Sequence, residues 1–221
     1  MEGLHAVIVI GGSPPHADVC ERLPAPAMVV AADSGVDIAL GLGLRVAAVV
    51  GDLDSASPAA LIDAEAAGAL VERHPADKDA TDVELALDWA LAHGAGSVTL
   101  VSGVGDRLDH LLGALGALAD RRFSGVPVDG WVGDAWVGVV HGGDTLTVSG
   151  APGEYVSLIP IGGVAAGVRT TGLRWPLDGD TLTPTSTRGV SNALLDRSAT
   201  VALDAGALLV IRPYALRPSP T

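Results

Sequence analysis

At residues 49–55 the chain reads Val49-Val50-Gly51-Asp52-Leu53-Asp54-Ser55, the clearest strand-to-turn signal in the sequence. It closes a short, valine-rich apolar run that begins at Val46, as buried parallel strands do. The helical stretch Pro58–Ala67 follows within a few residues. A buried strand, a polar turn and a helix in that order predict one βα unit of a parallel sheet.

The same alternation continues to about Arg122. Further apolar runs predict strands at Ala6–Ile10, Ala27–Ala31 and Val98–Val101. Further helices are predicted at Val36–Leu42, Asp82–His93 and Asp109–Ala119. Thr81 and Glu84 form a capping box at the start of the second of these helices. We therefore expect a Rossmann-like parallel sheet with helices on both faces.

The pattern changes after Arg122, where glycines and prolines separate short apolar runs and no convincing helix appears. The runs are Trp136–Val140, Thr145–Val148, Tyr155–Pro160, Val168–Thr171, Thr200–Leu203 and Leu208–Arg212. Short strands at such spacing are typical of an antiparallel sandwich or barrel. The sequence therefore predicts an α/β domain over residues 1–124, followed by an all-β sandwich domain over residues 125–221.

Net charge and cysteine content limit the partners and the compartment that the protein can have. The chain has 221 residues and a formal net charge of −13, which argues against nucleic acid or an anionic membrane as a partner. The single cysteine, Cys20, excludes an internal disulfide and fits a reducing compartment. The apolar run at the N-terminus is too brief for a signal or a membrane span. We expect a cytoplasmic protein.

Asp52 and Asp54 follow the strand directly and lie two residues apart. In an extended chain this spacing points both carboxylates to one side, at the carboxyl end of a parallel strand, where open α/β sheets bind ligands. Two facing aspartates repel each other unless a cation or a proton lies between them. The alternative is a solvated turn in which Asp54 or Ser55 caps the following helix.

A second acidic loop reads Asp77-Lys78-Asp79-Ala80-Thr81-Asp82. The helix macrodipole alone accounts for Asp82 at a helix start. It does not account for three aspartates packed around one lysine, which need a counter-ion. Lys78 could reach a phosphate while Asp79 or Asp82 faces a metal.

A third loop reads Ser102-Gly103-Val104-Gly105-Asp106-Arg107-Leu108-Asp109-His110. Glycines let backbone N–H groups approach phosphate oxygens, and Arg107 adds a planar cationic fork. The loop lacks the third glycine of the dinucleotide fingerprint and the Gly-Lys-Ser/Thr of a Walker loop. The alternative is a plain strand-to-helix turn capped by Asp109.

The three loops together combine carboxylates with basic or glycine-rich neighbours around one predicted sheet. Oxygen ligands without a His or Cys cluster select Mg²⁺ over zinc or copper. No Gly-x-Ser-x-Gly elbow is present, so a hydrolase triad is not supported. A magnesium-dependent enzyme that handles phosphate is the chemistry that this pattern favours.

The ordered motifs resemble those of thiamine pyrophosphokinases. In the first half they are Ala32-Asp33-Ser34-Gly35, Gly51-Asp52-Leu53-Asp54-Ser55, Asp79-Ala80-Thr81-Asp82-Val83-Glu84 and Gly105-Asp106-Arg107-Leu108-Asp109-His110. In the second half they are Val156-Ser157-Leu158-Ile159-Pro160, Thr171-Gly172-Leu173-Arg174-Trp175-Pro176-Leu177 and Gly189-Val190-Ser191-Asn192. The match runs from about Asp33 to Asn192.

The resemblance implies that residues 1–124 bind nucleotide and metal, and that residues 125–221 bind thiamine and form a homodimer with active sites at the interface. The substrates would be ATP and thiamine, with diphosphate transfer and release of AMP. The implied metal ligands for Mg²⁺ are Asp52, Asp54 and Asp82. The implied catalytic set adds Asp79 and Asp109, one of which would accept the hydroxyl proton. Together with the loop chemistry, the resemblance gives Asp33, Lys78, Thr81, Gly103, Gly105 and Arg107 as the expected nucleotide contacts. The implied thiamine contacts are Ser191 and Asn192.

Three positions depart from the family pattern. Ser34 stands where the family often has glycine, and Lys78 stands where it often has a polar residue such as glutamine. The tryptophan that some members stack on thiamine is replaced here by Leu208-Leu209-Val210. Trp175 is a conceivable substitute, although a Trp between strands is expected in the core.

Two other functions stay open: a diphosphokinase acting on a hydroxymethyl-pterin, and a non-catalytic sensor of nucleotide or thiamine.

Overall fold

The computed structural model describes residues 3–26, 28–104 and 107–216. The chain divides into two compact units. The first comprises residues 1–117 and 130–133, and the second comprises residues 118–129 and 134–221. The predicted nucleotide contact Gly105 lies outside the described residues.

The first unit holds a parallel sheet whose strands follow the order β5-β1-β2-β3-β4. Each neighbouring pair in this order is parallel. The strands are β1 (Leu4–Ile10), β2 (Met28–Ala32), β3 (Ala48–Gly51), β4 (Leu70–Arg73) and β5 (Ala95–Ser102). The helices are η1 (Ala17–Glu21), α1 (Gly35–Gly41), α2 (Pro58–Ala66), α3 (Asp82–Ala92) and α4 (Leu108–Leu118), the last of which reaches the second unit with its final residue.

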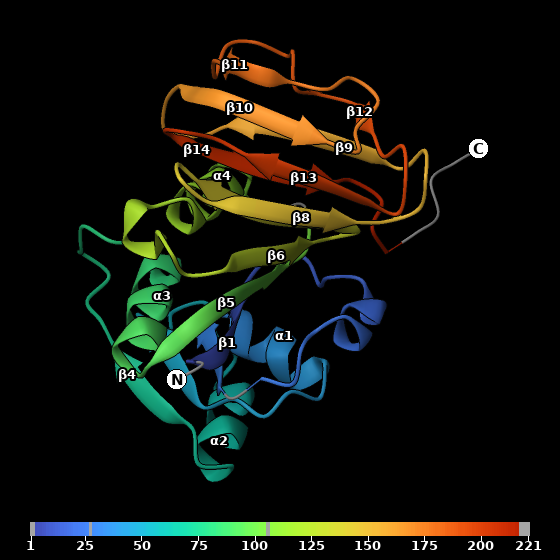
Figure 1. The fold of residues 1–221 in the computed structure, drawn as a ribbon. Coiled ribbons are helices and arrows are strands. Elements are labelled where there is room, and N and C mark those ends of the chain that lie inside the picture. The colour runs from blue at the N-terminus through green and yellow to red at the C-terminus, as the bar shows by residue number, and fades with distance from the viewer. Residues whose placement is uncertain (1–2, 27, 105–106, 217–221) are drawn as a thin grey trace. The chain divides into compact units, whose positions relative to one another are not determined.

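Helices cover the middle of this sheet on both faces. Ala6, Val7, Ile8 and Val9 in β1 have no exposed surface, although successive side chains point to opposite faces. Helix α3 packs against β1, β2, β3 and β5, whereas α1 packs against β1 and β2 and also contacts α2. Figure 1 shows α3 and α1 on either side of β1. Continuous apolar strands are therefore explained by burial on both sides.

Four of the strands and all four α-helices lie where the sequence predicts them, within a few residues. Strand β4 was not predicted, because it lies at the sheet edge and carries little apolar signal. Its Leu70 is 60% exposed, and Glu72 and Arg73 are exposed as well. An edge strand with charged residues is a common way to prevent pairing with other chains.

The second unit consists of two antiparallel sheets. One has the order β12-β9-β14-β7 and the other the order β11-β10-β13-β8. The strands are β7 (Ala135–His141), β8 (Thr145–Ser149), β9 (Tyr155–Pro160), β10 (Ala165–Thr171), β11 (Asp178–Leu182), β12 (Asn192–Ala193), β13 (Ser198–Ala202) and β14 (Ala207–Arg212). Strand β6 (Val128–Val132) has residues in both units, and the 3₁₀ helix η2 (Arg121–Phe123) precedes it.

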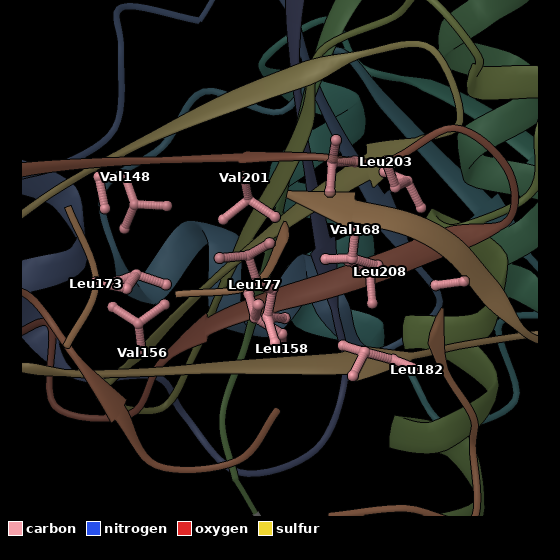
Figure 2. Close-up of a cluster of buried hydrophobic side chains, with 14 of the residues drawn as sticks. Val148, Val156, Leu158, Val168, Leu173, Leu177, Leu182, Val201, Leu203 and Leu208 are labelled. Atoms are coloured by element: carbon pink, nitrogen blue, oxygen red, sulfur yellow. The ribbon is translucent and has the colours of Figure 1, made fainter. Parts of the chain in front are cut away.

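One hydrophobic core lies between these two sheets. It contains Val156 and Leu158 from β9 together with Val148 from β8 and Val201 from β13, each at most 1% exposed. Figure 2 shows these side chains turned towards one another. Strand β9 alternates buried and less buried residues along its length, as expected for a sheet with one face on the core. Valine and leucine fill this core, in keeping with the low aromatic content of the chain.

The overall class is therefore a mixed α/β fold, with a parallel sheet in the first unit and antiparallel sheets in the second, as the sequence predicts in outline. Among the described residues, no helix is both long enough and apolar enough to cross a membrane.

Candidate active site

Three carboxylates converge at the carboxyl ends of neighbouring strands in the first unit. Asp33 directly follows β2, Asp52 directly follows β3, and Asp82 is the first residue of α3. One carboxylate oxygen from each lies within 4.8 Å of the other two. Because β2 and β3 are adjacent and parallel, their ends meet at one edge of the sheet. We call Asp33, Asp52 and Asp82 the carboxylate trio.

Gly51 makes room for this convergence. Its φ of 150° lies in a region that side chains rarely adopt. A Cβ placed on Gly51 would lie 3.0 Å from Oδ1 of Asp82 and 3.3 Å from Cβ of Asp33. A larger residue at position 51 would therefore crowd two members of the trio at once.

Asp33 has an unusual backbone conformation and a buried carboxylate oxygen. Its φ of 48° is unusual for a residue other than glycine. Its Oδ1 is buried and has no hydrogen-bond partner in the described part of the chain. Burial raises the pKa of the Asp33 carboxyl, and the charge of Asp82 raises it further, while hydrogen bonds from Ser34 and Ser55 lower it. A carboxylate oxygen so placed lacks a positive partner.

Lys78 lies beside the other two members. Its Nζ is 2.6 Å from Oδ1 of Asp82 and 3.9 Å from Oδ2 of Asp52. The lysine side chain is 15% exposed, and the two aspartate side chains are 24% and 19% exposed. The ammonium therefore offsets part of the mutual repulsion within the trio.

A cavity of about 720 Å³ opens at this edge of the sheet. Its lining joins the trio to the glycine-rich turns that follow β1 and β5 and to the starts of α3 and α4. Among the lining residues are Gly11, Gly12, Asp33, Ser34, Asp52, Lys78, Thr81, Asp82, Gly103, Arg107 and Asp109. The cavity is of the size that small-molecule ligands occupy.

Arg107 and Asp109 form a second charged feature of the cavity. The guanidinium donates from Nε to Oδ1 of Asp109 at 3.1 Å and from Nη2 to Oδ2 at 2.5 Å. Both side chains are more than half exposed. The hydrogen bonds from Arg107 lower the pKa of Asp109 to about 2. This carboxylate therefore stays ionised at neutral pH.

In the second unit, Ser191 and Asn192 have different environments. Ser191 is exposed, has a φ of 60°, and donates its backbone N–H to Oγ of Ser157 at 3.0 Å. Asn192 is only 6% exposed. Its Oδ1 accepts from the N–H of Trp175 at 3.0 Å, and its Nδ2 donates to the carbonyl of Trp175 at 2.7 Å. The amide of Asn192 is therefore occupied by backbone.

The expected burial of Trp175 is wrong. Its side chain is 56% exposed, and the guanidinium of Arg174 lies 5.1 Å from the ring centroid. Leu173 and Leu177 are the buried residues of this segment, at 1% and 7% exposed. We call the two hydrogen bonds between the Asn192 amide and the backbone of Trp175 the Asn192 clamp. The clamp holds the backbone of Trp175 while its ring faces solvent.

Comparison with known proteins assigns both halves of the chain to one family. Residues 21–128 match the model of the thiamin pyrophosphokinase catalytic domain. Residues 145–208 match the model of the thiamin pyrophosphokinase vitamin B1 binding domain. A crystal structure of thiamin pyrophosphokinase from Geobacillus thermodenitrificans is 30% identical, with a TM-score of 0.76, over 95% of this chain and 97% of that one. The chain belongs to the thiamine pyrophosphokinase family.

Other relatives agree. Thiamine pyrophosphokinase from Bacillus subtilis is 27% identical over 183 residues, which are 83% of this chain and 86% of the relative. A crystal structure of thiamine pyrophosphokinase from the same species has a TM-score of 0.80 at 25% identity, over 94% of this chain and 98% of that one. The resemblance in the sequence motifs is thus confirmed, and with it an enzyme of the kinase type. Neither the pterin diphosphokinase nor the sensor is favoured by these relatives.

Within this thiamine pyrophosphokinase fold, Asp54 does not join the trio. Its carboxylate is exposed and accepts a hydrogen bond from Oγ of Ser55 at 2.8 Å. The two-residue spacing from Asp52 would align the carboxylates only in an extended chain. Strand β3 ends at Gly51, and Leu53 has a φ of 65° with its side chain buried. The chain therefore turns between the two aspartates.

Asp79 is exposed and is not among the described residues that line the cavity. Thr81 lines the cavity and caps α3, because its Oγ1 accepts from the N–H of Glu84 at 3.4 Å. Asp109 is the second residue of α4 and not its N-cap. Gly103 lines the cavity and packs closely, since a Cβ there would lie 2.0 Å from the carbonyl of Ser13.

The turn after β1 is a part of the site that sequence reasoning missed. Gly11 and Gly12 line the cavity, and a Cβ on Gly11 would lie 2.2 Å from Oγ of Ser34. Gly11 therefore accommodates the serine that stands where the family often has glycine. The sequence did contain a signal for this turn. Two glycines follow a predicted buried strand, at the edge of the sheet where Asp33 and Asp52 also lie.

Proposed function

We propose that the chain transfers the diphosphate of ATP to the hydroxyl of thiamine, giving thiamine diphosphate and AMP. The observation that carries this proposal is the convergence of Asp33, Asp52 and Asp82 at one edge of the sheet. They line a cavity together with the cationic side chains of Lys78 and Arg107. In this reaction the hydroxyl oxygen attacks the β-phosphorus. The bond from that phosphorus to the oxygen bridging the α-phosphorus breaks, and AMP leaves with the bond electrons. The hydroxyl proton passes to water.

The trio fits a divalent cation. All its donors are oxygens, as Mg²⁺ prefers, and the buried Oδ1 of Asp33 has no other partner among the described residues. We therefore propose Asp33, Asp52 and Asp82 as the residues that hold Mg²⁺. When bound, Mg²⁺ would neutralise charge on the phosphate oxygens. Asp54 can join only if the turn at Leu53 changes its conformation.

The cavity lining supports the binding of phosphates in three ways. The turns at Gly11–Gly12 and Gly103 bring backbone close to the cavity. Helices α3 and α4 each have 11 residues and begin at the cavity, so their N-termini favour anions. Arg107 provides a planar cation suited to phosphate oxygens. Positioning and charge neutralisation carry most of the rate in phosphoryl transfer.

Neither candidate for the general base is favoured by its environment. Asp109 has a pKa of about 2 while Arg107 binds it, which makes it a weak base. Asp79 is exposed outside the cavity lining. The proposal gives Asp109 the role of orienting Arg107.

For thiamine, we propose that Ser191 and the exposed ring of Trp175 make the contacts and that Asn192 positions them. The amide of Asn192 is buried and already bonded to the backbone of Trp175. The exposed ring of Trp175 now lies against the guanidinium of Arg174. The cationic ring of thiamine would replace that guanidinium on the aromatic face. Trp175 is thus our substitute for the stacking tryptophan of some family members.

The remaining expectations are proposals of the same kind. The nucleotide domain is Rossmann-like, the second domain is a thiamine-binding sandwich, the enzyme is a cytoplasmic homodimer, and its active sites lie at the dimer interface. Light scattering on the purified chain measures the mass, and a monomer at micromolar concentration would remove the dimer from the proposal.

The direct test is an AMP-release assay with ATP and thiamine, with product identification by mass spectrometry. We expect thiamine diphosphate and AMP in equal amounts with Mg²⁺, and neither with excess chelator. A parallel reaction with a hydroxymethyl-pterin is expected to give no product. Release of AMP with the pterin alone, or tight binding of both substrates without AMP release over hours, would overturn the proposal.

A further inference from the structure

The chain contains a single lysine, although it has 13 lysine and arginine residues in all. This lysine is Lys78, and its Nζ contacts both Asp82 and Asp52. Its side chain is mostly buried, at 15% exposed, although long lysine side chains usually keep their ammonium in water. The only ammonium side chain of the protein therefore lies against two of the three residues proposed to hold the metal.

The electrostatics of the trio explain this position. Three carboxylate oxygens within 4.8 Å repel one another strongly when no cation is near. Lys78 supplies one positive charge to Asp82 and Asp52, while the buried oxygen of Asp33 has no partner among the described residues. The lysine thus compensates the trio incompletely and from one side.

We propose that Lys78 is an exchangeable counter-ion, which holds the trio together without metal and is displaced into the cavity when a divalent cation binds. The inference rests on the metal site proposed above. A divalent cation brings twice the charge of an ammonium and takes several oxygen ligands at once. It can satisfy Asp33 together with the two aspartates that Lys78 now contacts.

A bound nucleotide would give the displaced ammonium a second anionic partner within the same cavity. Of the described residues that line the cavity, Lys78 and Arg107 carry full positive charges, and Arg107 is already bonded to Asp109. A nucleotide diphosphate group beside the metal would present oxygens to the freed Nζ. Lys78 would then lower the affinity for metal alone and raise the affinity for nucleotide. A permanent structural ion pair would not produce these opposite effects.

The first test measures Mn²⁺ binding without nucleotide, by calorimetry or electron paramagnetic resonance. We expect Lys78→Gln to bind Mn²⁺ about 10-fold more tightly than the wild type, because the competing charge is gone. Arg107→Gln is the matched control, since it removes one positive charge from the same cavity but none from the trio. Unchanged or weaker binding by Lys78→Gln, or equal tightening in both variants, would overturn the proposal.

The second test needs no variant, because Lys78 is the only lysine. The folded protein is treated with a small amine-acylating reagent, and acylation of Lys78 is followed by peptide mass spectrometry. An added lysine peptide reports the reactivity of the reagent itself. Saturating Mg²⁺ is expected to raise the rate at Lys78 several-fold, because the side chain leaves its mostly buried position. Slower or unchanged acylation would contradict displacement.

The third test adds a non-hydrolysable ATP analogue at saturating Mg²⁺. Lys78→Gln should bind the analogue several-fold more weakly than the wild type, which is opposite in sign to its effect on Mn²⁺. Equal affinity for the analogue would refute the second half of the proposal. Turnover of thiamine by the wild type tests the proposed function separately, so active wild-type enzyme with a static Lys78 would reject this inference alone.

Discussion

Asn192 holds the backbone of Trp175 at both of its polar groups. The carbonyl oxygen of the Asn192 side chain accepts from the N–H of Trp175 at 3.0 Å, and the amide nitrogen donates to the carbonyl of Trp175 at 2.7 Å. The same oxygen also accepts from the N–H of Ala193 at 2.9 Å. One buried amide therefore satisfies both backbone polar groups of the exposed tryptophan.

Removing this clamp should destabilise the second unit. Asn192→Ala removes both hydrogen bonds to the partly buried backbone of Trp175, so we expect the free energy of unfolding to fall by about 1–3 kcal/mol. Urea denaturation followed by fluorescence measures this. Ser191→Ala is the control, and it should change stability by less than about 0.5 kcal/mol because the residue is exposed. Equal small losses in both variants would argue against the clamp.

Trp175 itself should matter for the substrate and little for the fold. Its side chain is 56% exposed, so Trp175→Ala should change the free energy of unfolding by less than about 1 kcal/mol. Loss of ring stacking, worth about 0.5–1.5 kcal/mol, should raise KM for thiamine by roughly 2- to 10-fold and leave KM for ATP unchanged. Trp175→Phe should retain part of the affinity. An unchanged KM for thiamine would place the stacking group elsewhere.

The carboxylate trio predicts a ranking of aspartate variants. Asp33→Asn, Asp52→Asn and Asp82→Asn should each lower kcat/KM by roughly 10²-fold or more, because each removes a proposed metal ligand. Asp54→Asn should lower kcat/KM by a smaller factor, because the Asp54 carboxylate is exposed and accepts a hydrogen bond from Ser55. Steady-state kinetics with ATP, thiamine and Mg²⁺ give the ranking. If Asp54→Asn were as inactive as Asp52→Asn, Asp54 would have to join the metal site through a rearranged turn.

The parts of the site that could be predicted from sequence are those governed by local rules. Thr81 caps α3 because a threonine followed three residues later by glutamate satisfies free N–H groups at a helix start. Asp33 and Asp52 could be placed at one edge of the sheet, because alternating strands and helices imply a parallel sheet whose strand ends meet. The loop with Lys78 could be placed beside them, since it opens the third predicted helix.

The parts that could not be predicted depend on backbone conformations that the residue types do not indicate. Nothing in a leucine favours a φ of 65°, so the turn at Leu53 that separates Asp54 from Asp52 has no signal in the sequence. The exposure of Trp175 depends on a hydrogen-bond clamp from a residue 17 positions later. Local patterns report strands and caps well, but they do not report such long-range contacts.

Asp109 offers a test of the cavity electrostatics by pH. The hydrogen bonds from Arg107 lower its pKa from the usual 3.8 to about 2. Because the folded-state pKa is depressed, the stabilising contribution of the pair is fully present above the unfolded value and is lost as the pH falls through about 2. We expect the carboxyl carbon of Asp109 to titrate near this value in NMR spectra of selectively labelled protein.

The matched variant for this titration is Arg107→Gln, which keeps a polar side chain but removes the charge and the guanidinium fork. In that variant the Asp109 carboxyl should titrate closer to 3.8, because the main cause of the depression is gone. Binding of an ATP analogue to the wild type should shift the titration in the same direction, since phosphate oxygens would draw Arg107 away from Asp109. An Asp109 titration that neither the variant nor the analogue moves would mean that Arg107 does not set the charge of this carboxylate.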